Sequence, residues 1–512
     1  MRDLPVPAQR EFGGDNPLRP HEALWAREEF LKAQGGIPAP SEKANVVIVG
    51  GGISGLFSAW LLRDQKPLLL EQAPRFGGNA RGESWNGIDY SIGAAYFMEH
   101  EKGGPINQLF EELGLYSLCR TKETDDPVYI NGELHTAFWE GSTDPANAAQ
   151  FKKLALHFQD IYKNRNGLLY PEVPADSPKM RAHINKLDRE SFLAYMKRVN
   201  GGPLHPHIGT ALEHYCWSTL GAGMKDVSSA MALNAYTAEF GKVFVAPGGN
   251  ARLAEHTMEK LIDTLGAGNL RSGALVVDVR VMGKKVHVTY STPSGALKTV
   301  ECNACVLACP KFVAGKILHG MEPARAKAIS KLNYFPYLVA NVCLKKKIAA
   351  EFYDAYLMKD GKVDHDDLMG SSRRHQSTDM VLATFASPSD TSTVLSLYRP
   401  LPWKAGRAEL YLEGSYEKAR AEFEKEIRAD ILPIVGANEA DIVDLRIARW
   451  GHPLPIGTPG LIRKGVCEAA HAPHKGKVFF VEQDNWMLPA IETCATEAIK
   501  WAPEVRKAAE KT

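Results

Sequence analysis

The sequence has little cysteine, no excess of charge of either sign and only one long uncharged apolar stretch. Its 512 residues include eight cysteines scattered along the chain, which favours reduced thiols over a disulfide framework. Lys and Arg total 61 and Asp and Glu total 60, so the formal net charge is +1. This balance gives no electrostatic reason to expect nucleic acid or an anionic membrane surface as the main partner. Hydrophobic residues at 45% and charged residues at 24% are typical of a soluble globular protein, and we expect a cytoplasmic one.

Residues 1–44 match neither a signal peptide nor a transit peptide, because they hold six basic and seven acidic side chains and no apolar core segment. A helix is predicted to start after Pro20 and to end at Gly35 and Gly36. We expect an N-terminal arm that packs on the body of the protein or on a neighbouring subunit, which leaves a homodimer open.

The uncharged stretch, residues 45–62, has about the length that raises the question of a transmembrane helix. Three consecutive glycines in its middle argue against a span. The β-branched residues 46–49 suit a buried parallel strand, and the residues from Ile53 onward suit a helix. We therefore predict a strand, a glycine turn and a helix, and no transmembrane segment.

Gly50, Gly52 and Gly55 in this turn have the spacing G-x-G-x-x-G. The first glycine allows a tight turn, the second lets the backbone approach a pyrophosphate, and the third lets the helix pack close to the strand. A second apolar strand follows and ends in Glu71, 21 residues after Gly50, where a carboxylate would accept hydrogen bonds from ribose hydroxyls. A carboxylate there disfavours the 2′-phosphate of NADP. The pattern predicts dinucleotide binding, with Ser54 and Gln72 as further binding residues.

The next stretch carries a second glycine pair, Gly77 and Gly78, between Arg75 and Arg81. Here the sequence resembles the flavin-dependent amine oxidase and phytoene desaturase superfamily, whose members follow the ribose-binding Glu with R-x-G-G-R and then with an Asp and a Gly near the flavin. The matching positions are Arg75, Gly77, Gly78, Asp89 and Gly93. The arginine that follows the glycine pair in the family is replaced by Asn79. Asn79, Arg81 and Ala94 are the cofactor-binding residues that the resemblance implies in this stretch.

Three later segments extend the resemblance in the order of the family, over roughly residues 45–501. Residues 245–265 resemble its P-x-G-G-x-x-x-L helix, and Val277 on the following strand would place backbone groups against adenine. Residues 304–313 resemble the strand that returns beneath the flavin. In the closing block, Asp484 would meet the ribityl or phosphate region, and a helix N-terminus at Ala490 and Ile491 would point at the flavin pyrimidine. The resemblance implies FAD as the cofactor.

This order of motifs predicts an α/β fold with two interleaved domains and an amine-oxidase-like layout. A Rossmann-like FAD-binding domain of three layers (ββα) would be assembled from about residues 45–103, 240–318 and 455–505. A mixed α+β substrate domain would be built from about 104–239 and 319–454, after the arm at 1–44. No second G-x-G-x-x-G follows, so reducing equivalents are expected from the organic substrate itself.

Candidates for catalysis must line the cavity over the flavin ring, because the protein supplies orientation and electrostatics there. Trp450 would form an aromatic wall, His452 would exchange a proton near the substrate, and Tyr96 would lie close to the flavin. Each has an alternative as an ordinary packing or surface residue. Many amine oxidases of the superfamily carry a lysine near the flavin, and the alignment places Asn341 there. A dehydrogenase, desaturase or isomerase then becomes more plausible than an oxidase.

Two other groupings suggest metal ligands but are better explained otherwise. Cys302, Cys305 and Cys309 fall on one predicted strand between apolar residues, as buried thiols do. His205 and His207 lie in a proline-rich loop without a carboxylate motif. No metal site is predicted.

Three functions remain open. The first is an oxidoreductase that passes a hydride from a carbon beside nitrogen to FAD, and it is favoured. The second is an isoprenoid or carotenoid-type desaturase or isomerase that acts on C–C bonds, with residues 210–240 lining a tunnel for an apolar, lipid-like substrate. The third is a non-catalytic partner that keeps the flavoprotein fold.

Overall fold

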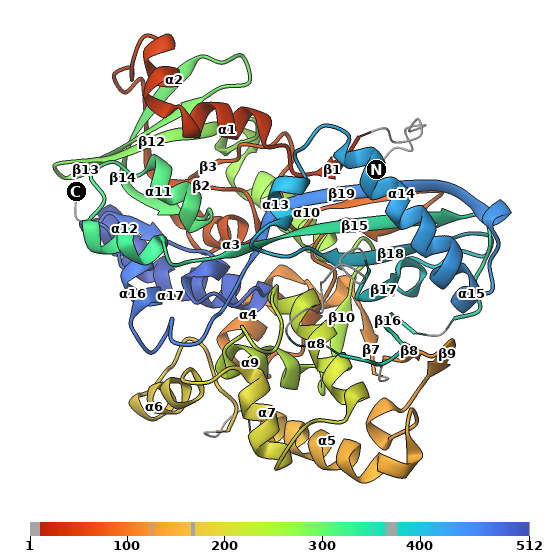
Figure 1. Cartoon of the computed structure of the whole chain (residues 1–512). Coiled ribbons are helices and arrows are strands. Elements are labelled where there is room, and N and C mark those ends of the chain that lie inside the picture. Colours follow the sequence, from red (N-terminus) through yellow and green to blue (C-terminus); the bar gives the residue numbers. More distant parts are fainter. Residues whose placement is uncertain are drawn as a thin grey trace.

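Two large β-sheets form the framework of the protein, with helices between and around them (Figure 1). The computed structural model describes residues 11–123, 126–164, 169–350, 352–363, 365 and 376–510. Figure 1 shows the first sheet at the upper left, the second at the right, and a group of helices below both.

The first sheet has seven strands drawn from separate stretches of the chain. Their order is β11 (Leu270–Arg271), β3 (Leu68–Leu70), β2 (Glu42–Val49), β14 (Leu297–Leu307), β13 (Lys285–Ser291) and β12 (Leu275–Met282), with β20 (Val478–Phe480) also beside β14. Strands β11, β3, β2, β14 and β20 pair in parallel, and β12, β13 and β14 form an antiparallel meander. The predicted strand at 46–49 is confirmed within β2.

Strand β2 is buried on both faces, which is why its sequence is a continuous run of β-branched residues. Val46 and Ile48 pack against one cluster of helices, and Val47 and Val49 pack against the side of the meander. The helices on the first side are α3 (Ile53–Leu61), α10 (Asn250–Leu265) and α17 (Ile491–Glu510). Helices, parallel strands and antiparallel strands give the three layers that the sequence predicts.

The second sheet has eight strands and carries helices on each face. Its order is β1 (Gly13–Gly14), β19 (Ile442–Pro455), β15 (Tyr334–Leu344), β18 (Thr393–Pro400), β17 (Asp379–Leu382), β16 (Asp354–Lys359), β8 (Val128–Ile130) and β9 (Glu133–His135). Leu338, Ala340 and Val342 of β15 pack on the side of α14 (Ser415–Glu426) and α15 (Leu432–Val435). Tyr337 and Val339 face the opposite way, so the alternation along β15 separates two clusters.

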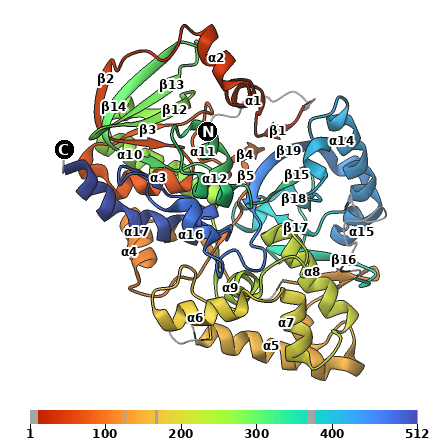
Figure 2. The ribbon, with the colours of Figure 1, turned by 60° about the vertical axis from the view of Figure 1, so that its left-hand side comes forward.

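The remaining helices lie below the two sheets or bridge them (Figure 2). The lower group comprises α5 (Ala148–Lys163), α6 (Pro178–Leu187), α7 (Phe192–Asn200), α8 (Pro206–Leu220) and α9 (Ser229–Ala238). Others are α4 (Pro105–Leu113), α11 (Lys311–Ile317), α12 (Pro323–Ile329), α13 (Gly406–Glu409) and α16 (Val466–His471). Short strands complete the body: β4 (Gly82–Trp85), β5 (Ile88–Ser91), β6 (Phe97–Met98), β7 (Arg120–Lys122) and β10 (Val243–Val245).

The N-terminal arm packs on the first sheet as two helices, where the sequence predicts one. Helix α1 (Leu18–Trp25) starts two residues before Pro20, and α2 (Arg27–Ala33) follows a break at Ala26, whose φ of −109° and ψ of 45° are not helical. Arg27, the first residue after the break, donates to the Val277 carbonyl at 2.8 Å and pairs with Asp278 on β12. These contacts are tertiary, so the local sequence does not reveal the break.

The stretch at 45–62 divides into strand, turn and helix, as predicted. Across the described ranges, no helix has the combined length and apolar character needed to cross a bilayer. The boundaries of the two interleaved domains stay a prediction.

Candidate functional site

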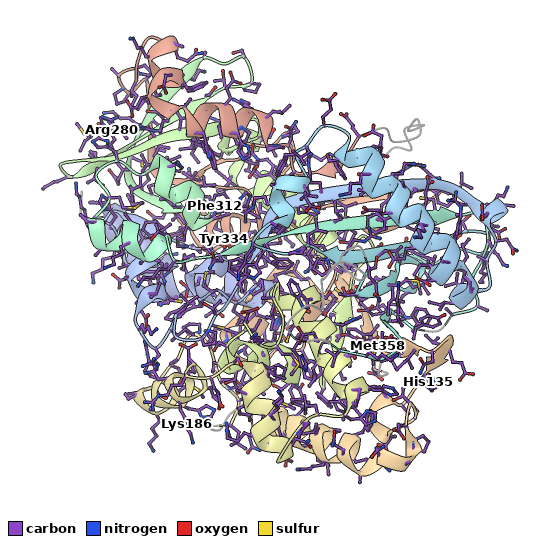
Figure 3. The ribbon with its side chains drawn as sticks, in the orientation of Figure 1. His135, Lys186, Arg280, Phe312, Tyr334 and Met358 are labelled. Carbon is purple, nitrogen blue, oxygen red and sulfur yellow. The ribbon has the colours of Figure 1, made fainter. Side chains whose placement is uncertain are left out.

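A cavity of about 1350 Å³ lies between the two sheets and is lined by residues of both. Usual small-molecule pockets occupy about 300–1000 Å³, so this volume has room for a large cofactor together with a substrate. Phe312 of α11 and Tyr334 of β15 lie close to each other where the two sheets meet (Figure 3), and their ring centroids are 5.0 Å apart. One half of the cavity is lined by glycine turns and the other half by tyrosines and carboxylates.

The glycine turn after β2 shows a separate reason for each of its three glycines. A Cβ on Gly50, whose φ is +109°, would lie 2.2 Å from the Ala308 carbonyl oxygen, and a Cβ on Gly55 would lie 1.8 Å from the Gly50 carbonyl oxygen. These two glycines are needed by the fold itself. A Cβ on Gly52 would have its nearest neighbour, the Gly78 Cα, at 3.6 Å. Gly52 is therefore not required by the packing, and it lines the cavity at the N-terminus of α3.

Glu71 follows β3 and is buried beside the same turn. Its carboxylate accepts hydrogen bonds from the backbone N–H groups of Gly51 and Ala73, both at 2.7 Å. Burial raises its pKa, and the two backbone donors oppose that rise. Gln72 lies next to it on the wall of the cavity. The acidic group is thus held in a fixed position, where the sequence predicts contact with a ribose.

The second glycine pair lies against the first turn. Gly77 donates its N–H to the Gly51 carbonyl at 2.8 Å, and both Gly77 and Gly78 have positive φ, at 120° and 60°. Arg81 donates from Nε to the Gly78 carbonyl at 3.0 Å, and its guanidinium carbon lies 4.7 Å from the centroid of the Trp450 ring. Burial lowers the pKa of Arg81. A cation is thus present at this turn although Asn79 replaces the expected arginine.

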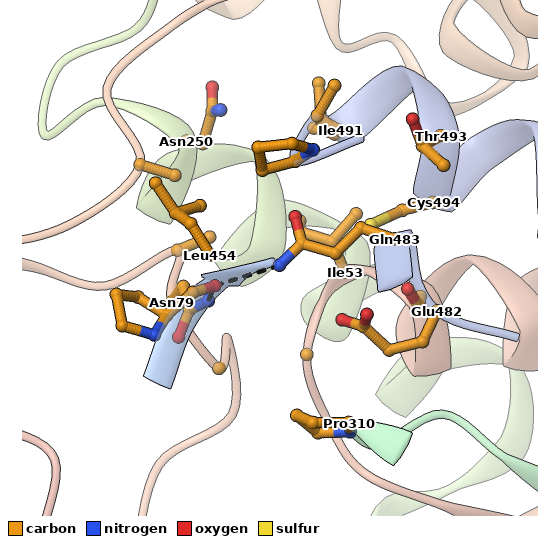
Figure 4. A pocket seen from close by; sticks show the side chains of 18 of the residues that line it. Ile53, Asn79, Asn250, Pro310, Leu454, Glu482, Gln483, Ile491, Thr493 and Cys494 are labelled. Carbon is orange, nitrogen blue, oxygen red and sulfur yellow. Dashed lines mark hydrogen bonds between the residues drawn. The ribbon is translucent and has the colours of Figure 1, made fainter. Parts of the chain in front are cut away.

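Asn79 and Gln483 connect the second glycine turn to strand β19 of the second sheet. Their side-chain amides both donate to the Pro453 carbonyl, at 2.7 Å and 3.0 Å, and Figure 4 shows Gln483 reaching toward Asn79. Glu482 lies beside Pro310 in the same view and lines the cavity, and burial raises its pKa to about 8.

Two of the predicted cofactor residues lie away from the cavity wall. The Asp484 carboxylate accepts hydrogen bonds from the backbone N–H of Lys311 at 2.6 Å, the Lys311 Nζ at 2.5 Å and the Tyr334 hydroxyl at 2.6 Å. It is therefore engaged behind the wall, and Glu482 and Gln483 face the cavity instead. The Val277 carbonyl is similarly engaged by Arg27 of the arm, at 2.8 Å.

At the end of the cavity near β12, the wall is formed by segments that are far apart in the sequence. The adjacent residues 274–276 line it in place of Val277, and residues of the N-terminal arm line the cavity as well. The lining residues of the arm are Asp15, Asn16, Pro17, Pro20, His21, Leu24 and Trp25. No motif in the sequence predicts this contribution of the arm.

Of the other predicted cofactor residues, all except Gly55 line the cavity: Gly50, Gly52, Ser54, Glu71, Gln72, Gly77, Gly78, Asn79, Arg81, Ala94, Ala490 and Ile491. Gly55 lies behind the turn against the Gly50 carbonyl, where its part is to let helix and strand pack closely. The last two lie at the start of α17, and a helix start supplies N–H groups without intrahelical partners. The fold thus brings predicted residues of the stretch 50–94 and the distant residues 490–491 to one cavity.

The three predicted catalytic residues also line this cavity. The Trp450 Nε1–H donates to the Ile92 carbonyl at 2.6 Å, which fixes the plane of its ring. The His452 ring packs against the Phe312 ring at an interplanar angle of 31°, with centroids 4.4 Å apart, and burial lowers the pKa of His452 to about 3. A neutral imidazole at this place can accept or donate a hydrogen bond but carries no charge at neutral pH. Tyr96 donates to Glu239 at 3.0 Å, and burial raises its pKa.

The sequence did not reveal the tyrosines and carboxylates of the other half of the cavity. Tyr337, Tyr356, Tyr398, Asp354 and Asp379 all line it from strands of the second sheet. Their only local signal is the alternation of side chains between the two faces of each strand. This alternation does not tell which face of the sheet borders a cavity.

Three other features of the sequence lie outside the cavity wall, except for Cys309, which lines the cavity just after the end of β14 and therefore not on the same strand as Cys302 and Cys305. Asn341, where the alignment places the lysine of the family, is fully buried in β15, accepts a hydrogen bond from Ser396 at 2.6 Å and is not among the residues that line the cavity. Burial raises the pKa of the Cys302 and Cys309 thiols to about 12. His205 lies at 3.0 Å from Asp144 and caps α8.

Residues 48–113 match the family model of the NAD(P)-binding Rossmann-like domain. Oxidoreductase PigB from a Serratia species is 23% identical over 92% of this chain and 78% of its own length. An L-amino-acid oxidase from Notechis scutatus scutatus is 21% identical over 64% of this chain, which spans only 63% of that oxidase.

Among solved structures, putrescine oxidase bound to putrescine superposes with a TM-score of 0.65 and 16% identity, over 91% of this chain and 99% of the oxidase. Cyclohexylamine oxidase from Brevibacterium oxydans gives a TM-score of 0.63 and 16% identity, over 92% and 99%. These likenesses show the fold. The chain thus shares its fold with these amine oxidases and has a Rossmann-like segment, and the relatives matched by sequence are themselves oxidoreductases.

Proposed function

We propose that the protein is an FAD-dependent oxidoreductase that removes a hydride from an organic substrate, with the carbon–nitrogen bond of an amine as the favoured site. The observation that carries the proposal is the continuity of the cavity, which joins the glycine turns to a chamber lined by tyrosines and carboxylates. A dinucleotide and a substrate could then lie in contact inside one cavity.

The residues of the first half fit FAD. Gly52 leaves a space at the N-terminus of α3 that a side chain would fill, and a helix N-terminus favours phosphate. Arg75 and Arg81 line the same half and add positive charge near that turn. Glu71 would accept hydrogen bonds from a ribose. Bound FAD would supply the acceptor for the hydride, and the protein would orient the substrate and exclude water.

Three side chains would shape the place of reaction. Trp450 would form one aromatic wall, held by its bond to the Ile92 carbonyl. Tyr96 would position Glu239 behind the wall through their hydrogen bond. His452 would act as a neutral hydrogen-bonding group, because the low pKa keeps its ring uncharged.

The polar character of the chamber favours an amine over the alternative of an isoprenoid-type substrate. Asp354, Asp379, Ser218 and Tyr337 place carboxylates and hydroxyls on the wall, and covering such polar groups with a long apolar chain is unfavourable. An amine would supply hydrogen-bond donors to them.

The proposal can be tested with purified protein. We expect a yellow preparation with the absorption spectrum of FAD, whose flavin band bleaches when amines, but not isoprenoid lipids, are mixed in without oxygen. Bleaching by the lipids alone would favour the desaturase or isomerase reading. A colourless protein that does not take up added FAD would contradict both and support a non-catalytic partner.

A further inference from the structure

The N-terminal arm runs from the second sheet to the first and contributes to the wall of the cavity on the way (Figure 1). On the second sheet, β1 pairs in parallel with β19, and the Asp15 carboxylate accepts a hydrogen bond from the Gly451 N–H at 2.6 Å. On the first sheet, Arg19 donates to the carbonyls of residues 273, 291 and 292. The arm residues that line the cavity begin at Asp15 and end at Trp25, so this stretch bridges the two sheets beside the cavity.

The contacts of the arm place it at the half of the cavity where a dinucleotide is expected. The Gly14 carbonyl accepts a hydrogen bond from Arg81 at 2.8 Å, and Arg81 lines the cavity at the second glycine pair. Gly273, whose carbonyl accepts from Arg19 at 2.8 Å, directly precedes residues 274–276 of the cavity wall. The arm thus lies beside the cation expected near a pyrophosphate and beside the segment expected near adenine.

The arm before Ala26 is held less firmly than the other walls of this half. Strand β1 has two residues and lies at the edge of the second sheet. Two of the eight residues of α1, Ala23 and Leu24, are buried, whereas eight of the nine residues of α3 are buried behind the glycine turn. Segments that bury few apolar side chains open at the lowest cost in free energy. The arm is therefore the wall that can move with the least disruption of the core.

The break between the two helices of the arm provides a hinge. The backbone of Ala26 is not helical, with a φ of −109° and a ψ of 45°. Beyond it, α2 is fastened to the first sheet, because Arg27 binds the Val277 carbonyl and Asp278 on β12, and Leu31 is buried in the core of that sheet. Hinges are commonly a few residues at the ends of elements that absorb a change in backbone angles. Residues 13–25 can thus swing about Ala26 while α2 stays in place.

We propose that residues 13–25 are the gate of the cofactor site, and that FAD enters and leaves the cavity only after this segment swings away about Ala26. The proposal rests on the proposed function, because it takes FAD as the ligand. A weaker attachment of a gate raises the fraction of molecules in which the gate is open, so the rates of FAD uptake and FAD release rise together. A segment that only contacts bound FAD would affect the release rate alone, as most contact residues do.

Phe12→Ala is the variant that weakens the attachment without altering the wall, because Phe12 is not among the residues that line the cavity. The centroid of its ring lies 5.2 Å from that of Tyr416 and 4.9 Å from the guanidinium carbon of Arg449. Loss of these two contacts should raise both rates about tenfold, and the Kd, which is their ratio, should stay within about threefold of the wild-type value. Uptake by the cofactor-free protein is followed by flavin fluorescence. Release is measured by chasing radiolabelled FAD with excess unlabelled FAD.

Phe385→Ala is the matched control. The Phe385 ring also packs against one tyrosine and one arginine, with its centroid 5.4 Å from that of Tyr353 and 4.2 Å from the guanidinium carbon of Arg120. Neither partner belongs to the arm, and Phe385 does not line the cavity. This variant should keep both wild-type rates.

Arg19→Ala is a second arm variant, which removes the attachment to the first sheet. It should also speed up uptake, and release should rise further, because Pro17 and Pro20 close to Arg19 line the cavity. Uptake at the wild-type rate in both arm variants would overturn the proposal, even if release were faster. A protein that takes up no FAD at all would instead contradict the proposed function.

Discussion

Among the three glycines of the turn after β2, Gly52 is the one that the proposed cofactor would require and that folding does not. Its φ of −74° and ψ of −177° are open to any residue, and an added Cβ would have no protein atom nearer than 3.6 Å. Gly52→Val should therefore fold, with the stability of the cofactor-free protein changed by no more than about 0.5 kcal/mol. The new methyl groups would occupy the space proposed for the pyrophosphate, so FAD should be lost.

The expected size of this effect follows from linkage. A ligand present at about 1,000 times its Kd stabilises the native state by about 4 kcal/mol. For 512 residues, an unfolding entropy of about 2.1 cal/mol/K per residue amounts to about 1.1 kcal/mol/K, so bound FAD should raise the melting temperature by about 4 °C. Gly52→Val should lose this increment, and after gel filtration its flavin absorbance should be near zero.

Gly55→Ala is the contrasting variant, because its Cβ would lie 1.8 Å from the Gly50 carbonyl oxygen. It should destabilise even the cofactor-free protein, by about 3 kcal/mol or about 3 °C. The reasoning would be refuted by a Gly52→Val protein that holds one FAD per chain after gel filtration, or by one that melts as low without cofactor as Gly55→Ala does.

Three further predictions concern Asp379, the buried ion pair and the arm. Burial raises the pKa of Asp379 from 3.8 to about 6, so its contribution to stability is full below pH 3.8 and is lost as the pH rises through 6. Relative to Asp379→Asn, the wild type should lose about 2 kcal/mol between pH 4 and pH 8 in urea unfolding; parallel pH profiles would disprove this. Lys311→Met should lower the free energy of unfolding by about 3–5 kcal/mol, because it leaves Asp484 buried without its cation. The double variant Lys311→Met/Asp484→Leu should recover most of this stability. A double variant no more stable than the single one would count against the argument. Arg19 donates hydrogen bonds to the carbonyls of residues 273, 291 and 292. Arg19→Ala should therefore loosen the arm and weaken FAD binding about tenfold, as measured by fluorescence titration. An unchanged affinity would show that the arm does not contribute to FAD binding.

The local sequence gave good predictions wherever a structure is held by its own backbone. The β-branched run before the glycines forms the end of β2, and the residues after them form α3. Likewise, Asn131 and Gly132, a residue pair typical of tight hairpin turns, connect β8 to β9 with φ values of 52° and 88°. Each depends on conformational preferences that act within a few residues. The single helix predicted for the arm was wrong, because the break at Ala26 accompanies contacts of Arg27 with a strand 250 residues away.

In the candidate site, too, some features follow from the local sequence and others from the packing of the two sheets. The sequence by itself determined the glycine turn, the carboxylate of Glu71 that follows it and the resemblance to the flavin-dependent amine oxidases, because these depend on residue type at fixed spacing. Only the tertiary structure decided that Asp484 is engaged by Lys311 behind the wall, and that Asp354 and Asp379 share one face of a sheet inside the cavity. Spacing along the chain fixes which residues lie near one another within a turn or a strand. Which distant residues meet, and which of them border the cavity, is set by how the two sheets pack.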